Sequence, residues 1–168
     1  RIGSALLPGE LGVRFVTVLL STGSIWLLWL LAGRPHTRSD QNTLLLLFAV
    51  MPMLQVYAFV ATPDSPLLFF ALLFFFVYDR FVRQGTWGNT LLLGAVMAAM
   101  LYSKYHGILV IGFTVLSDLR LLRQSRFYAA ALFGVLLFAP HLYWQISNEF
   151  PSLRYHLLGR SEPFQPKD

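Results

Sequence analysis

The chain has 168 residues, of which 56% are hydrophobic and only 12% are charged, and its formal net charge is +5. A soluble domain carries about 25% charged residues, so this chain could hardly cover its surface in water. The composition therefore excludes an ordinary soluble domain and favours an integral membrane protein. The absence of cysteine excludes disulfides and thiolate metal sites. No nucleotide-binding loop, Ser–His–Asp set or zinc spacing is present.

Six apolar runs follow one another along the chain. They are Phe15–Ala32, Thr43–Ala61, Pro66–Val82, Asn89–Tyr102, Gly107–Leu122 and Phe127–Ile146. About 20 helical residues span a bilayer core about 30 Å thick. The first, second and sixth runs fit this length, and the others span if their charged ends lie at the interface. We predict an all-α, polytopic transmembrane bundle of about six helices, with residues 1–168 forming one domain.

The loops between these runs alternate in charge. The loops at 33–42, 79–88 and 118–126 hold Arg34, Arg38, Arg80, Arg83, Arg120, Arg123 and Arg126. The two intervening loops hold only Asp64 and Lys104. The positive-inside rule places the arginine loops in the cytoplasm, so Asp64, Lys104 and the tail from Ser147 share the outer face. The net charge is thus explained by topology, and no nucleic-acid partner is predicted.

Two runs carry residues suited to helices in lipid. Gly94, Ala95, Ala98 and Ala99 give the fourth run a small face that permits close helix packing. Pro140 lies inside the sixth run, where a neighbouring helix can compensate for the carbonyl that it leaves free.

Asp64 lies between two prolines at the start of the third run, in the stretch "ATPDSPLLFF" (61–70). Pro66 suits the first residue of a helix, so Asp64 or Ser65 can serve as its N-cap, where a carboxylate is favoured by the helix dipole. Alternatively, Asp64 lines a polar cavity at the membrane surface. The two readings are compatible.

Lys104 interrupts apolar sequence in "YSKYHG" (102–107), together with Tyr105 and His106. A lysine at the bilayer centre costs about 2.5–3.5 kcal/mol on insertion scales, and such residues tend to mark sites. Lys104 is either a snorkelling interfacial anchor or a point charge for an anion such as a lipid phosphate. His106 is either a polar anchor or a donor or metal ligand, and Tyr105 is grouped with the same candidate site.

The tail from 147 to 168 mixes charged and apolar residues. Leu153, Leu157 and Leu158 form a stripe from which Arg154 and His156 are displaced, which predicts a short amphipathic helix on the outer surface. This helix is either a surface anchor or a lid over a lipid head group, in which arginine grips phosphate.

Four stretches together resemble the integral-membrane glycosyltransferases of the GT-C fold, in the bacterial branch related to protein O-mannosyltransferases and to the lipid A aminoarabinose transferase. They are "GELGVRFVTVLLSTGSIWLL" (9–28), "ATPDSPLLFF" (61–70), "YSKYHGILV" (102–110) and "PHLYWQISNEFPSLRYHL" (140–157). Each is weak alone, but they occur in the family's order and cover nearly the whole chain.

The resemblance implies a hexosyl or pentosyl transferase of the bacterial cytoplasmic membrane, surrounded by membrane lipids. Its donor is a sugar linked to a polyprenyl phosphate, and its acceptor is a lipid or protein on the outer face. Asp64 and Lys104 match family residues that line the donor cavity, and Arg14 matches an arginine at the start of the family's second helix. No metal site is predicted, and a divalent cation is left open.

The family's acidic residue after its first helix, the base that activates the acceptor, has no match in this sequence. We expect that residue upstream of Arg1, and this fragment alone is expected to be inactive. Two rivals stay open from the residues alone: a transporter or flippase for a lipid-linked or anionic substrate, which would also place Asp64 and Lys104 at a cavity mouth, and a membrane scaffold. Neither explains the ordered matches.

Overall fold

The structure is a computed structural model that describes residues 10–33, 37–50, 62 and 64–148. This part of the chain is helical and contains no strand. Its elements are α2 (Glu10–Leu31), α3 (Arg38–Val50), α5 (Asp64–Gln84), α6 (Trp87–Ser103), α7 (Gly107–Ser117), the 3-10 helix η1 (Leu119–Arg123) and α8 (Ser125–Ser147). The predicted all-α bundle of about six helices is confirmed.

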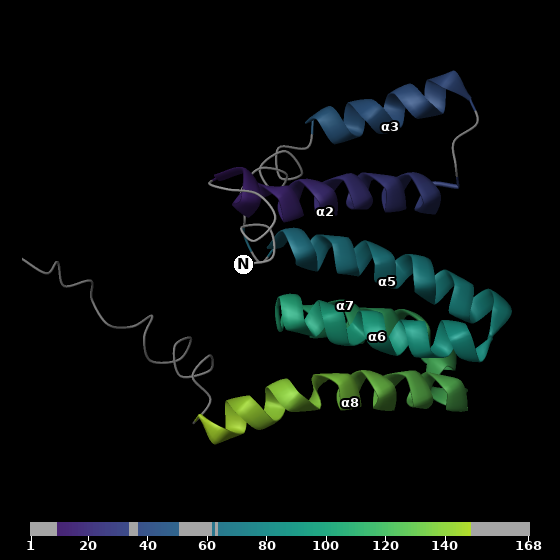
Figure 1. Cartoon of the computed structure of the whole chain (residues 1–168). Coiled ribbons are helices and arrows are strands. Elements are labelled where there is room, and N and C mark those ends of the chain that lie inside the picture. The colour runs from purple at the N-terminus through teal and green to yellow at the C-terminus, as the bar shows by residue number, and fades with distance from the viewer. Residues whose placement is uncertain (1–9, 34–36, 51–61, 63, 149–168) are drawn as a thin grey trace, which may run out of the picture.

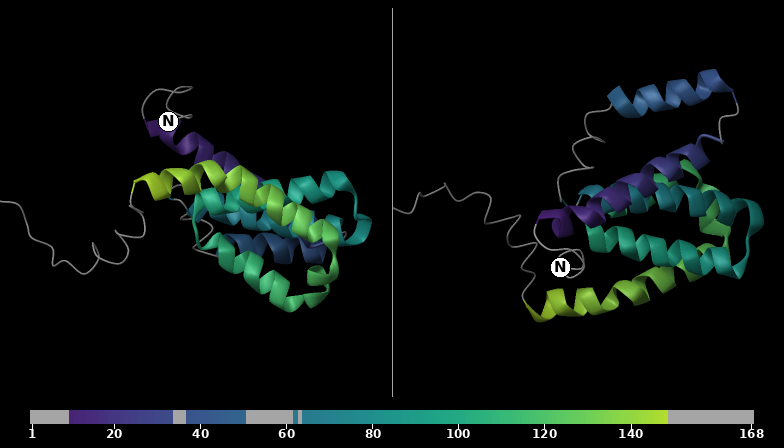
Figure 2. Two further views of the ribbon diagram at one scale, coloured as in Figure 1. Left: turned by 90° about the horizontal axis from the view of Figure 1, so that it is seen from below. Right: turned by 45° about the horizontal axis from the view of Figure 1, so that its top comes forward.

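The helices lie side by side in an up-and-down bundle (Figure 1). The main contacts join α6 to α8, α5 to α6, and α2 to α5. α3 stands at the edge, away from α5, α6 and α8, in Figure 1 and in the right-hand view of Figure 2. α6 therefore occupies the middle of the bundle, and the buried core gathers around it. That core includes Phe74, Leu93, Met100 and Leu121.

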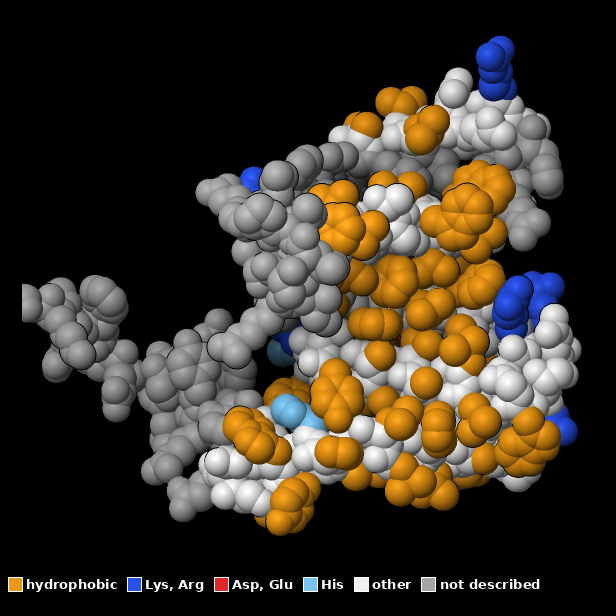
Figure 3. All heavy atoms as spheres, in the orientation of Figure 1, with side chains coloured by type: hydrophobic (Ala, Val, Ile, Leu, Met, Phe, Trp, Pro, Cys, Tyr) orange, Lys and Arg blue, Asp and Glu red, His pale blue; other side chains and the backbone are white. Residues whose placement is uncertain are grey.

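Three helices are long and apolar enough to cross a membrane: α2 from Arg14 to Leu31, α5, and α8. Only 17%, 22% and 22% of these segments are buried within the protein, so most of their residues are at least partly exposed. Figure 3 shows hydrophobic side chains over most of the described face. Apolar surface of this extent requires lipid around it, and the chain is an integral membrane protein.

The predicted fifth run, Gly107–Leu122, is wrong as a single helix. α7 ends at Ser117, and η1 follows after Asp118. The Asp118 carboxylate accepts hydrogen bonds from the Arg120 N–H and the Tyr78 hydroxyl, each at 3.2 Å. Asp118 thus ends one helix and caps the next, a local competition that hydropathy does not report.

The other bounds differ from the predicted runs in smaller ways. α2 begins at Glu10, and α5 begins at Asp64, so Pro66 is the third residue of its helix. α3 begins at Arg38, earlier than Thr43. The second run beyond Val50 lies outside the described residues.

The small face of α6 packs directly against α8. A Cβ added at Gly94 would lie 2.4 Å from the backbone oxygen of Ala130, and one added at Gly134 would lie 2.9 Å from the backbone oxygen of Gly94. Ala98 on the same helix is buried. The prediction of close packing is confirmed, and the small residues allow the backbones of α6 and α8 to approach closely near Gly94.

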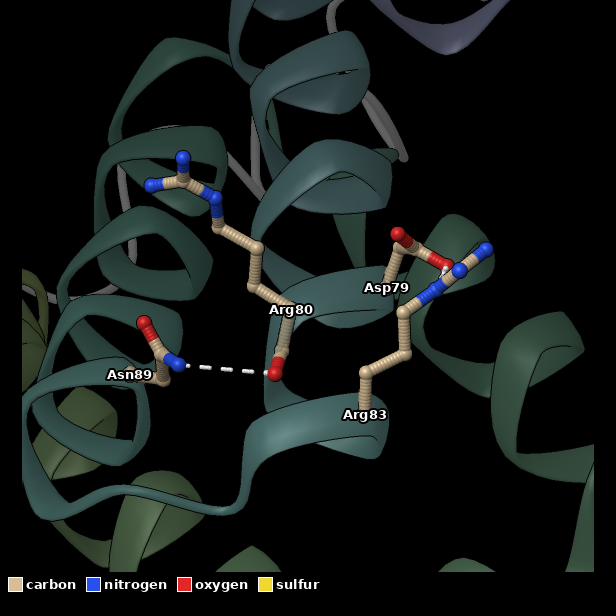
Figure 4. Close-up of polar contacts among 4 residues, drawn as sticks. All are labelled: Asp79, Arg80, Arg83 and Asn89. Atoms are coloured by element: carbon tan, nitrogen blue, oxygen red, sulfur yellow. Dashed lines mark hydrogen bonds and ion pairs between the residues drawn. The ribbon is translucent and has the colours of Figure 1, made fainter. Parts of the chain in front are cut away.

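The turn between α5 and α6 lies at the end of the bundle where arginines gather. Gly85 adopts a φ of +55° and donates its N–H to the Phe81 carbonyl, which ends α5. Thr86 caps α6 by accepting the Asn89 N–H at 3.3 Å. The Asn89 amide donates to the Arg80 carbonyl at 3.4 Å, as Figure 4 shows. Side chain and backbone together fix this turn.

Candidate functional site

An ion pair joins two helices at the opposite end of the bundle. The Lys104 Nζ lies 2.5 Å from the Asp64 Oδ1, and the two residues are 40 positions apart in the sequence. The lysine side chain is 38% exposed and the aspartate 30%. The two charges that the sequence analysis singled out are thus direct partners, and both side chains are partly exposed.

The ends of the helices explain why these charges are tolerated there. Asp64 is the first residue of α5, where the helix dipole is positive, and Lys104 is the C-cap of α6, where it is negative. The Lys104 N–H donates to the Met100 carbonyl, and its carbonyl accepts the Gly107 N–H. The ion pair therefore links the start of α5 to the end of α6. Lys104 is also the first residue of the tight turn into α7. The expected position of Asp64 at the favourable end of the helix dipole is compatible with this pairing.

Tyr105, the next residue in that turn, contacts α8. Its hydroxyl lies 2.7 Å from His141 Nε2 and accepts a short hydrogen bond from the Gln145 amide. Gln145 is buried, at 5% exposure, whereas Tyr105 is 40% exposed. A tyrosine, a histidine and a glutamine from two segments thus meet beside Lys104.

Aromatic rings surround this polar cluster. Tyr102 packs edge-on against Phe138 with ring centroids 5.0 Å apart, and its hydroxyl donates to the Leu137 carbonyl at 3.1 Å. The latter contact lies next to the break in the helical ladder that Pro140 imposes on α8. The His141 ring stacks on Trp144 at 6.1 Å. The α6–α7 turn is therefore fixed to α8 by both rings and hydrogen bonds.

The remaining predicted site residues are less well integrated. His106 is exposed and begins α7 without a side-chain cap. Arg14 is exposed in the first half of α2, whose N-terminal end lies on the same side of the bundle as the α5 start in Figure 1. Arg154 and His156, with the predicted tail helix, lie outside the described residues. Within the described residues, the structure joins Asp64 directly to Lys104, and Tyr105 follows Lys104 in the same turn.

Two contributors, His141 and Gln145, were missed by the sequence analysis. They lie four residues apart on α8, so they share one face of that helix. In an apolar run, two polar side chains with this spacing predict a polar helix face that points into the protein. Within the described residues, no three side chains of His, Cys, Asp or Glu gather as metal ligands. The divalent cation stays an untested expectation.

Comparison with known proteins gave one family. The profile of the family described as dolichyl-phosphate-mannose-protein mannosyltransferase matches residues 2–144. This range contains Arg14, the Asp64–Lys104 pair and His141. No curated protein and no solved structure gave a match. The family consists of membrane glycosyltransferases, which favours the enzyme over the transporter and scaffold alternatives.

Proposed function

Because the chain belongs to the dolichyl-phosphate-mannose-protein mannosyltransferase family, we propose that it acts in sugar transfer from a polyprenyl-phosphate donor whose phosphate binds at Lys104. The acceptor is a lipid or protein hydroxyl. The observation that supports this proposal most strongly is the placement of Lys104, at a helix end of a membrane bundle and 38% exposed beside the Asp64 carboxylate.

The chemistry of the donor suits this placement. A lysine ammonium has three donors, so it can keep Asp64 and still bind a phosphate oxygen. In the transfer, the acceptor oxygen forms a bond to the anomeric carbon while the bond from that carbon to the phosphate oxygen breaks. The acceptor proton passes to a general base. Lys104 stabilises the negative charge that develops on the departing phosphate.

The orientation in the membrane follows from the arginines. Arg80, Arg83, Arg120, Arg123 and Arg126 lie at the end of the bundle where α5 meets α6 and η1 meets α8, and Figure 3 shows Lys and Arg side chains gathered mainly there. The positive-inside rule places that end in the cytoplasm. We therefore propose that the Lys104 end faces outward, in a bacterial cytoplasmic membrane, where a lipid-linked donor replaces nucleotide sugars.

The direct test is binding of dolichyl phosphate to the purified protein in detergent. We expect Lys104→Ala to weaken binding about tenfold or more, which corresponds to about 1.4 kcal/mol. Lys104→Ala combined with Asp64→Asn removes the leftover carboxylate, so charge repulsion cannot account for a loss that persists in this double variant.

The matched control is Arg83→Ala. Arg83 also pairs with a carboxylate, Asp79, at 2.7 Å, but at the other end of the bundle (Figure 4). We expect this variant to bind dolichyl phosphate like the wild type. Equal binding by wild type and both Lys104 variants would contradict the proposal, as would an equal loss in Arg83→Ala.

A further inference from the structure

The hydrogen bonds between the α6–α7 turn and α8 use only one of the two protons that Tyr105 and His141 can donate. The Gln145 amide nitrogen can only donate, so the Tyr105 oxygen is its acceptor. Neutral His141 and Tyr105 carry one proton each, and the bond between them, at 2.7 Å, uses one of the two. In either tautomer the other proton is a donor that points away from the pair.

The surroundings of this donor are aromatic and partly open. Tyr102 lies 5.5 Å from the His141 ring and Trp144 lies 6.1 Å from it, and these two flanking residues are 52% and 51% exposed. The negative faces of aromatic rings attract polarised C–H groups. Aromatic surface with a few fixed polar groups is typical of small-molecule sites. A sugar ring has this chemistry, with C–H groups on its faces and hydroxyls at its edge.

The sugar of the proposed donor is within reach of this cluster. Tyr105 follows Lys104 directly, so their Cα atoms are about 3.8 Å apart. One oxygen joins the sugar to the phosphate in a glycosyl phosphate. The Lys104 side chain contacts α5 and the Tyr105 side chain contacts α8, so a donor with its phosphate at Lys104 and its sugar at Tyr105 and His141 extends across this turn from the α5 side to the α8 side.

We propose that Tyr105 and His141 form the subsite that binds the sugar ring of the donor, and that Gln145 is a positioning residue that orients the Tyr105 hydroxyl. This inference rests on the proposed function, since it requires the phosphate at Lys104. It divides the donor between two sets of residues, with charge recognition at Lys104 and sugar recognition at the α6–α7 turn and α8.

The experiment compares two lipids, dolichyl phosphate and dolichyl phosphate mannose, on each purified variant. We expect the wild type to bind the mannosylated lipid more tightly. Tyr105→Phe and His141→Phe each keep a ring and remove a hydrogen-bonding group, so we expect each to reduce this preference about two- to tenfold, with a smaller effect on the affinity for dolichyl phosphate. Because both lipids are measured on the same sample, partial loss of folded protein cancels in the ratio.

Tyr102→Phe is the matched control. It removes one tyrosine hydroxyl from the same cluster, but that hydroxyl donates to a backbone carbonyl, and the sugar preference should persist. A wild type without preference for the mannosylated lipid would overturn the inference. So would variants that weaken both lipids equally, since a cluster that only clamps the helices has that effect. Failure of the proposed function itself is seen separately, as unchanged dolichyl phosphate binding in Lys104→Ala.

Discussion

The two ends of the bundle carry charge in different ways. At the arginine end, an ion pair joins Asp79 and Arg83, which are four residues apart on one helix and whose side chains are 52% and 75% exposed. At the other end, Asp64 and Lys104 come from different helices and are more buried. The contacts of Tyr105 with His141 and Gln145 also join segments far apart in the sequence.

The two ion pairs therefore differ in what they need: one forms within a single helix at the surface, and the other requires the packed bundle. An exposed pair within one helix contributes about 0.3–0.5 kcal/mol and needs no tertiary structure. The Asp64–Lys104 pair exists only when α5 and α6 are packed. The arginine end also has a tertiary contact, from Tyr78 to Asp118, but this contact caps a helix break. Arginines at that end also lie over aromatic rings, Arg80 over Phe76 and Arg126 over Trp87, as interfacial anchors do.

The largest expected effect is a difference in labelling between the two ends of the bundle, because they lie on opposite sides of the membrane. The chain has no cysteine, and α8 begins and ends with exposed serines, Ser125 at the arginine end and Ser147 at the other. We expect a membrane-impermeant maleimide to label Ser147→Cys in intact cells and to label Ser125→Cys only after permeabilisation. The reverse pattern would contradict the outward orientation.

Gly94→Ala should break the packing on which both ends depend. The added Cβ meets the Ala130 backbone oxygen at 2.4 Å, and a backbone atom cannot move aside as a side chain can. We expect a loss of about 1–3 kcal/mol in unfolding free energy, measured by denaturant titration in detergent.

Gly112→Ala is the control for that variant, because nothing lies within 4 Å of its added Cβ. Alanine is favoured over glycine in a helix, so this change should be neutral or slightly stabilising. Equal destabilisation by both changes would show that the close approach of α6 and α8 does not decide stability.

Asp64→Asn should change the affinity for dolichyl phosphate by a smaller amount. The Asp64 carboxylate repels a phosphate bound to Lys104, and the interaction energy of partly exposed charges is about 0.2–1 kcal/mol. We therefore expect dolichyl phosphate to bind up to about fivefold more tightly to this variant, by equilibrium titration. Asp79→Asn at the arginine end should leave the affinity unchanged. Weaker binding by Asp64→Asn would mean that the carboxylate supports the phosphate site.

Most of the fold could be predicted from hydropathy, because long apolar runs in a membrane have few alternatives to helices. The break at Asp118 could not, since the run from Gly107 to Leu122 is apolar over most of its length and the cause is a side chain that binds Tyr78 and the Arg120 N–H. In a sequence window, one aspartate near a helix end is compatible with a continuous helix.

The site was predicted in part. Asp64 and Lys104 stand out because charge is costly in apolar sequence, and alternating loops place both on one face. Their direct pairing depends on the register of α5 against α6, which loop charges do not specify. His141 and Gln145 were missed because uncharged polar residues hardly change the hydropathy of α8, and only contact with Tyr105 reveals them.

The central claim is that the donor phosphate binds at the Lys104 end. The most direct measurement is photo-crosslinking with a dolichyl phosphate analogue that carries a diazirine beside the phosphate, followed by peptide mapping. The account predicts adducts in the turn at 104–106 and in the first turn of α5. Adducts in the arginine segments at 83–88 or 118–126, or an even spread over both ends, would contradict it.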